Sequence, residues 1–175
     1  MHLELPIKTS RLIIENFSEK HISPRYISWL NDPEVVKYSE QRHVKHDKES
    51  CINFFNSFKG GVNSFLALIA DDQSLGHIGN ITTTMNIPNG SVDIAILIGE
   101  KKVWGQGYGL EAWRAVMDAI IQMRKIRKIT AGCMSENKAM LSIMEKSEMV
   151  YEYTKPKMFL LEGREVDSIH YATYL

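Results

Sequence analysis

The sequence has little cysteine and no long hydrophobic run. Its two cysteines, Cys51 and Cys133, lie far apart and form no Cys-x-x-Cys pair. This spacing argues against a disulfide framework and against a zinc site, so we expect no metal and a reducing, cytoplasmic setting. No window approaches the roughly 20 apolar residues of a membrane-spanning helix, and the N-terminus lacks a signal-peptide pattern. We therefore expect no membrane partner.

The chain also has no net charge, because 21 Lys and Arg balance 21 Asp and Glu. Proteins that bind nucleic acid by neutralising phosphates carry a basic excess, so we expect no nucleic-acid partner. An apolar content of 44% and a charged content of 24% are ordinary for a globular protein. At 175 residues, we expect one domain spanning 1–175 with a sizeable core, as a monomer or a homodimer.

Three glycines stand at alternate positions in the stretch Val103–Ala112. An apolar, β-rich segment precedes this stretch, and a helical pattern follows it. Glycine permits positive φ angles and the close approach of a ligand to the backbone. Free N–H groups at a helix start bind anions, so the sequence predicts a phosphate or pyrophosphate site. The predicted apolar face of the following helix carries Leu110, Trp113, Met117, Ile120 and Ile121.

The spacing separates this loop from two other nucleotide-binding patterns. A P-loop needs Gly-Lys-Ser/Thr, whereas Gly109 is followed by Leu110 and Glu111. A dinucleotide fingerprint needs a glycine directly after a strand and an acidic residue about 20 positions later. Here Glu100–Lys102 intervenes, and the next predicted strand ends without such an acid. A glycine-rich turn without a ligand is the remaining alternative, and three glycines in this context disfavour it.

Apolar periodicity and turn residues predict the other elements. A helix from His21 to Leu30 should bend near Pro24, and another should restart near Pro33. Asp47 should cap a helix that ends at Gly60-Gly61, the loop helix should reach Met123, and Asn137–Ser147 should be helical. The three central strands should form an antiparallel meander. The predicted strands are Leu3–Phe17, Ser64–Ala70, Gly76–Met85, Ser91–Gly99, Lys128–Cys133, Met149–Leu161 and Val166–Tyr174.

The glycine stretch resembles the acetyl-coenzyme A loop of the GNAT acyltransferases, Arg/Gln-x-x-Gly-x-Gly/Ala. Trp-Gly-x-Gly-Tyr-Gly followed by Glu-Ala, together with Thr9-x-Arg11-Leu12 near the N-terminus, is similar to the RimJ/RimL-type branch of that family. The order of the predicted elements also resembles the family. The resemblance implies an α/β fold of the α+β kind. Its mixed, mostly antiparallel sheet of six to seven strands would splay between the fourth and fifth strands, with flanking helices and acetyl-CoA as co-substrate.

The resemblance also implies where the coenzyme binds. Backbone N–H groups at Leu97, Ile98 and Gly99 should be freed where the strands splay, and should meet the thioester oxygen and the pantetheine arm. Asn137 matches an asparagine that bonds this arm, although a helix N-cap explains it equally well. Trp104 should pack beside the loop. The expected loop contacts of the coenzyme are Trp104, Gly105, Gln106, Gly107, Tyr108, Gly109 and Leu110.

Asp93 is the candidate base because it is the lone acid in an apolar strand. Alternation places it on the face of Ala95 and Leu97, and histone acetyltransferases carry a catalytic glutamate at the matching distance from the loop. A structural acid at a strand end is the alternative. Three positions depart from relatives. Met144 replaces a tyrosine that protonates the thiolate, Gly132 replaces a glutamate of some N-terminal acetyltransferases, and Glu148 replaces a glycine.

The acceptor site is expected in the polar loop of Tyr38, Glu40, Arg42 and His43, with His77 and Asn80 on a neighbouring strand. Glu40 could hold an ammonium and Arg42 an anionic group. A solvated loop is the alternative, and for His77 a structural role. The mixed charges favour a small polar acceptor over a basic peptide. The resemblance implies transfer of acetyl to a primary amine by direct attack in a ternary complex, and the stretch Leu30–Arg42 resembles family members that act on amino sugars and similar small molecules. Acetylation of protein N-termini, a non-catalytic acyl-CoA sensor and a partner-binding module are the alternatives.

Overall fold

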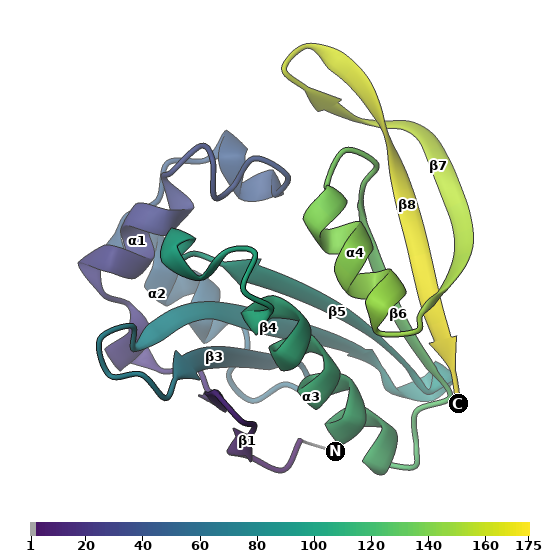
Figure 1. Cartoon of the computed structure of the whole chain (residues 1–175), viewed down its shortest axis with the longest axis horizontal. Helices are drawn as coiled ribbons and strands as arrows, with labels where there is room; N and C mark the ends of the chain where they lie inside the picture. Colours follow the sequence, from purple (N-terminus) through teal and green to yellow (C-terminus); the bar gives the residue numbers. More distant parts are fainter. Residues whose placement is uncertain (1–2) are drawn as a thin grey trace.

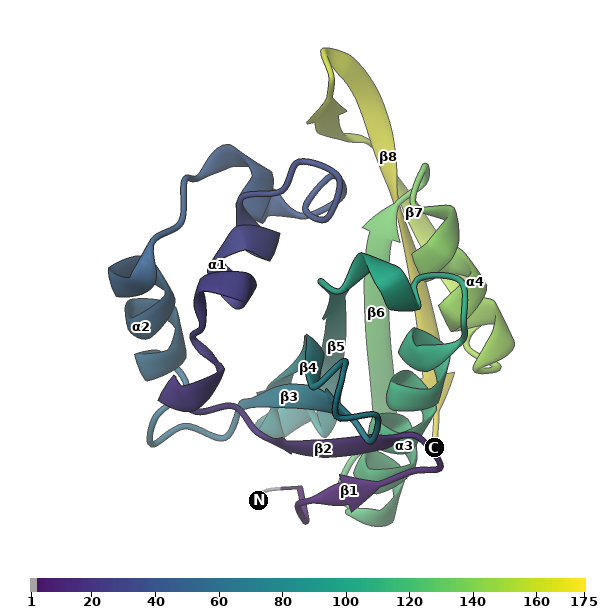
Figure 2. The same cartoon turned by 60° about the vertical axis from the view of Figure 1, so that its left-hand side comes forward.

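The computed structural model describes residues 3–175, which build one eight-stranded sheet with helices on both faces (Figures 1 and 2). The strand order is β1-β2-β3-β4-β5-β6-β8-β7. We expected six to seven strands; the extra one arises because the N-terminal stretch folds back at Thr9–Arg11. The strands are β1 (Ile7–Lys8), β2 (Leu12–Asn16), β3 (Ser64–Ala70), β4 (His77–Asn86), β5 (Ser91–Ile98), β6 (Lys128–Met134), β7 (Val150–Leu161) and β8 (Arg164–Tyr174).

The one parallel pair of the described sheet, β5 with β6, separates early. The two strands pair only over Ser91–Asp93 and Lys128–Thr130. Beyond this point β5 continues along β4 and β6 continues along β8. The predicted splay is therefore confirmed. We call the opening between β5 and β6 the wedge, and Asp93 with Thr130 forms its closed end.

Two pairs of helices cover opposite faces of the sheet. Helices α3 (Tyr108–Gln122) and α4 (Lys138–Lys146) lie on one face, and α1 (Pro24–Leu30) and α2 (Lys48–Asn56) lie on the other (Figure 2). Alternation divides β5 between the faces, because Ile94 and Ile96 join the core beside α3 whereas Leu97 packs with the core beside α1. Asp93, four residues before Leu97, therefore lies on the α1 face.

The long helix α3 packs as its apolar pattern predicts, with one exception. Trp113, Met117 and Ile120 are buried against the sheet. Ile121 is 39% exposed, because one step along a helix turns a side chain by about 100° away from its neighbour. None of the helices in residues 3–175 is long and apolar enough to cross a membrane.

The N-terminal third differs most from its prediction. The helix expected from His21 is a 3-10 turn at Glu19–His21, and α1 begins only at Pro24, where Ser23 accepts the Tyr26 N–H at 3.1 Å. No helix restarts at Pro33; turns follow, and the Asp32 carboxylate holds the Glu34 N–H at 2.9 Å. Helix α2 has its predicted cap at Asp47 but ends at Asn56, before the glycines.

Candidate active site

The glycine loop joins β5 to α3 through a 3-10 turn at Lys101–Val103. Gly105 and Gly107 have φ angles of +74° and +84°, a region that side chains disfavour. Gly107 is the N-cap residue of α3 and offers no side-chain acceptor, so the first helical N–H groups are left without an intrahelical partner. The loop therefore presents backbone donors at the positive end of a helix dipole.

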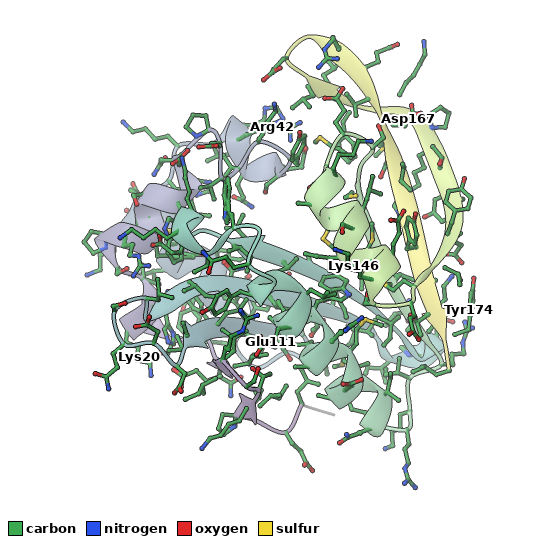
Figure 3. All side chains as sticks on the ribbon, viewed as in Figure 1. Lys20, Arg42, Glu111, Lys146, Asp167 and Tyr174 are labelled. Carbon is green, nitrogen blue, oxygen red and sulfur yellow. The ribbon has the colours of Figure 1, made fainter. Side chains whose placement is uncertain are left out.

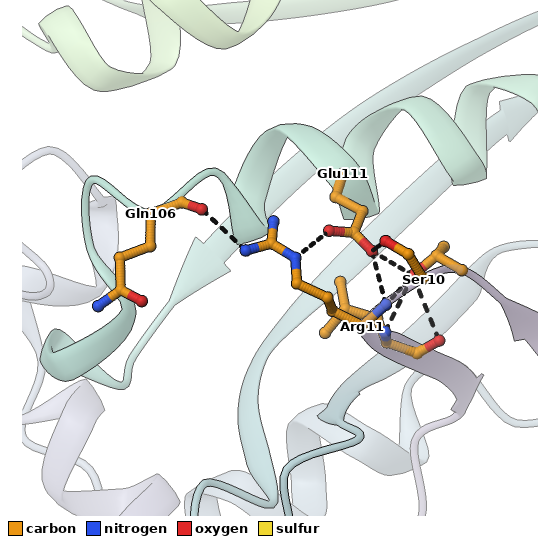
Figure 4. Close-up of polar contacts among 6 residues, drawn as sticks. Ser10, Arg11, Gln106 and Glu111 are labelled. Atoms are coloured by element: carbon orange, nitrogen blue, oxygen red, sulfur yellow. Dashed lines mark hydrogen bonds and ion pairs between the residues drawn. The ribbon is translucent and has the colours of Figure 1, made fainter.

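A clamp from the N-terminus holds this loop in shape (Figure 4). The Glu111 carboxylate accepts hydrogen bonds from Thr9 Oγ1 at 2.6 Å, from Ser10 Oγ at 3.0 Å and from Arg11 Nε at 2.7 Å. Arg11 also donates to the Gln106 carbonyl at 3.0 Å and stacks over the Tyr108 ring. Burial acts to raise the pKa of Glu111, but these hydrogen bonds outweigh it and the pKa is lowered. Glu111 is therefore a stable anion.

Backbone groups at the end of β5 are used differently from our expectation. The Gly99 N–H donates to the Ile78 carbonyl at 3.0 Å, so it is not free. Because backbone direction alternates along a strand, the Leu97 N–H also points toward β4, whereas Ile96 and Ile98 point toward the wedge. The Ile98 carbonyl accepts from Trp104 Nε1 at 2.9 Å. Of the three predicted donors, only Ile98 faces the wedge.

Asp93 stands at the closed end of the wedge. Its carboxylate accepts a hydrogen bond from Thr130 Oγ1 at 2.8 Å. Part of the Asp93 residue is exposed to solvent, but protein atoms surround its carboxylate. The resulting desolvation raises the pKa of Asp93. The Thr130 hydrogen bond and the nearby imidazole of His170 oppose the shift only in part. A carboxylate of raised basicity thus lies on the α1 face of the wedge.

Arg42, predicted to bind the acceptor, instead joins two parts of the protein. Its guanidinium donates to the Ser39 carbonyl at 2.8 Å, to Glu40 Oε1 at 2.7 Å and to the Leu160 carbonyl at 3.2 Å. Leu160 lies near the tip of the β7–β8 hairpin, which Arg42 faces in Figure 3. Tyr38 also packs against the core of this hairpin, whereas Glu40 and His43 are largely exposed. We call the Arg42–Leu160 contact the clasp.

His77 and Asn80 lie on β4 but in different surroundings. The His77 ring sits among Phe17, Tyr26 and Trp29, and burial lowers its pKa to about 4. This is the structural role that the sequence left open. The Asn80 side chain is buried and opposes Leu97 across the ladder, and its Oδ1 has no hydrogen-bond partner within residues 3–175. Such an orphan acceptor costs about 1–3 kcal/mol unless a ligand donates to it.

Comparisons with known proteins agree with this geometry. The family model described as acetyltransferase (GNAT) domain matches residues 11–150. The chain belongs to this family. Its members transfer acyl groups, and this chain is an acyltransferase. The N-acetyltransferase 9-like protein of Nematostella vectensis is 24% identical over 154 residues, covering 82% of this chain and 76% of that protein.

Solved structures share the GNAT fold over nearly the whole chain. A GNAT-family acetyltransferase from Bacillus anthracis is 25% identical with a TM-score of 0.81, covering 96% of this chain and 97% of that one. RimL, a ribosomal L7/L12 α-N-protein acetyltransferase in complex with coenzyme A, is 15% identical with a TM-score of 0.82 and 97% coverage of both chains. Spermidine N-acetyltransferase from Vibrio cholerae, in complex with coenzyme A and spermine, is 15% identical with a TM-score of 0.82, covering 95% of this chain and 96% of that one.

Three positions tied to the GNAT resemblance have clear structural surroundings. Asn137 is the N-cap of α4, and its Oδ1 accepts the Met140 N–H at 3.1 Å, which leaves the side-chain amide group for a ligand. Met144 is fully buried in the core, so it packs and donates no proton. Gly132 has its missing side-chain space filled by the His170 ring. Among residues 3–175, no group of three His, Cys, Asp or Glu could hold a metal.

Sequence reasoning missed two features of this GNAT site. The first is the Arg11–Glu111 clamp. Thr9-x-Arg11 indicated only a likeness to the RimJ/RimL-type branch, and no contact with Glu111 was predicted. His170 lies in an ordinary-looking strand, and its partners come from β6 and β7. Only the strand register, which the sequence does not give, brings it to Gly132.

Proposed function

We propose that this protein moves the acetyl group of acetyl-CoA to a primary amine of a small molecule, by direct attack in a ternary complex. The observation that carries the proposal is the position of the glycine loop. Free N–H groups at the start of α3 follow β5, the strand that borders the wedge, after one 3-10 turn and the glycine loop. We further infer the RimJ/RimL-type branch, because the Thr9-x-Arg11 motif of that branch bonds Glu111, which follows the loop glycines, and the Gln106 carbonyl within the loop.

In this proposal the coenzyme is held mainly by backbone groups. The N–H groups around Gly107 and Gly109 bind the pyrophosphate, and the Asn137 side-chain amide bonds the pantetheine arm. The arm lies in the wedge, where the Ile98 N–H donates to the thioester oxygen and stabilises the negative charge of the tetrahedral intermediate. Gly105 and Trp104 shape the approach, Trp104 by fixing the Ile98 carbonyl.

The acceptor approaches from the α1 face. Its amine nitrogen attacks the thioester carbon, the carbon–sulfur bond breaks, and coenzyme A leaves. Asp93 attracts the ammonium and assists its deprotonation, and the orphan Asn80 Oδ1 accepts a hydrogen bond from the acceptor. Glu40 pairs with Arg42, but its side chain is 63% exposed, whereas that of Arg42 is only 14% exposed. A small cationic or hydroxyl-rich amine therefore suits the site better than an anionic one.

Acetylation of a protein N-terminus is the second candidate, supported by the fold shared with RimL. A thiol-release assay with acetyl-CoA separates the two. We expect turnover with polyamines or amino sugars and little with peptides that mimic ribosomal-protein N-termini. Asp93→Asn should lower kcat by about 100-fold, because the neutral amide neither attracts the ammonium nor assists its deprotonation. Turnover of the peptides alone would favour the second candidate, and no thiol release with any amine, despite coenzyme binding, would favour a non-catalytic sensor.

A further inference from the structure

A second titratable side chain stands beside the wedge, on the same face as Asp93. His170 of β8 opposes Gly132 of β6, and direct partners in an antiparallel ladder share a face. Gly132 lies two residues beyond Thr130, the partner of Asp93, and therefore also on the α1 face. The wedge thus has a carboxylate on one side and an imidazole on the other.

The His170 imidazole lies over Gly132 of β6, in the space that a side chain at this position would fill. A side-chain carbon built on Gly132 would lie 2.7 Å from His170 Nδ1 and 2.8 Å from Cε1, closer than real atoms approach. Any residue larger than glycine would displace the ring.

Neighbouring side chains hold the His170 ring in place. Tyr153 of β7 stacks on it with 4.4 Å between ring centroids, and Nε2 lies 2.9 Å from Ser168 Oγ. The contact with Ser168 fits either tautomer of the ring. In the tautomer in which Nε2 donates to Ser168 Oγ, Nδ1 is unprotonated, and Nδ1 has no hydrogen bond within residues 3–175. Burial, followed by the charge of Lys155, lowers the pKa of His170, while Asp93 and Glu152 oppose the shift. The ring is therefore neutral at pH 7.

We propose that His170, in the tautomer that leaves Nδ1 unprotonated, takes the proton of the acceptor ammonium beside the wedge. This rests on the proposed function and divides its chemistry: Asp93 attracts the ammonium, and His170 receives one proton. The neutral amine then attacks the thioester carbon and the carbon–sulfur bond breaks. A second nitrogen-bound proton reaches the departing thiolate, so coenzyme A leaves as a thiol, and the imidazolium returns its proton to water.

The test measures kcat against pH at saturating acceptor, for wild type and variants with unchanged circular dichroism. Wild-type kcat should fall on the acid side of the ordinary histidine pKa of about 6.5, since protonated imidazole accepts no proton. His170→Gln should lower kcat by about 100-fold and remove this acid limb, with unchanged affinity for acetyl-CoA. Gly132→Ala, which moves the ring without changing it, should also lower kcat.

A double variant separates chemistry from packing. Gly132→Glu with His170→Ala places a carboxylate in this space. Its kcat should be about tenfold higher than that of His170→Gln, with an acid limb shifted toward lower pH. A His170→Gln variant with kcat within about threefold of wild type and the same acid limb would overturn the assignment alone. Failure of the double variant to recover activity, with its fold intact, would also count against it. A wild type that turns over no amine overturns the proposed function, and this assignment with it.

Discussion

At the scale of single residues, Gly107 combines a backbone requirement with a spatial one. Its φ angle of +84° disfavours any side chain, and its N–H stands at the proposed pyrophosphate site. Gly107→Val should weaken acetyl-CoA binding at least about tenfold, or 1.4 kcal/mol, measured by calorimetry. Gly163→Val is a matched control, because Gly163 has a φ angle of +78° in the distant hairpin turn with no atom within 4 Å of an added carbon. Equal affinities in the two variants would contradict this placement.

Residue identities predicted the local surroundings of some candidate site residues, while their roles stay predictions. Asp93 was visible as a lone acid in an apolar strand, and Asn137 as a helix cap. The contacts of Arg42 were not predictable, because they include the Leu160 carbonyl, 118 residues away, besides Glu40. A sequence shows the charge of an arginine but not whether a distant carbonyl already occupies it.

At the scale of elements, the clasp connects the acceptor loop to the β7–β8 hairpin. Arg42→Ala should raise the acceptor KM severalfold and leave coenzyme affinity unchanged, because the loop loses its support while the glycine loop is untouched. Hydrogen exchange near Leu160 should accelerate in the same variant. Arg164→Ala is a suitable control, since Arg164 lies on the same hairpin, is 64% exposed and pairs with Glu136 instead. An unchanged KM would show that the clasp does not shape the acceptor site.

Strands and helices were predictable where apolar residues repeat with a period of two or 3.6 over several residues. The bounds of β3 were predicted to the residue, and those of α4 within one residue at each end. The turns after α1 were not predicted. There the Asp32 carboxylate accepts the Glu34 N–H, and this local hydrogen bond competes with the hydrogen bonds of a helix. The division between β1 and β2 was also missed, since a two-residue strand leaves too short a pattern.

At the scale of the whole molecule, the wedge divides the sheet into two parts. Strands β1 to β5 form one part and β6, β8 and β7 the other, joined by three parallel residue pairs. A coenzyme in the wedge should bridge them. At 100 times its Kd, acetyl-CoA should add about 2.7 kcal/mol, which raises the melting temperature by about 5–10 °C for this size. Gly107→Val, with a Kd about tenfold higher, should show at most about half of this shift at the same concentration. A wild type without any shift would contradict binding in the wedge.

The clamp on Glu111 determines when, during folding, the chain becomes able to bind the coenzyme. Its hydrogen bonds join residues 100 to 102 positions apart. Contacts of such sequence separation form late, because a long loop must close before they contribute. The glycine loop therefore takes its final shape only after the first strands have docked beside α3. Coenzyme affinity, followed in time during refolding, should then appear with the last step of folding, so that a partly folded chain holds no coenzyme.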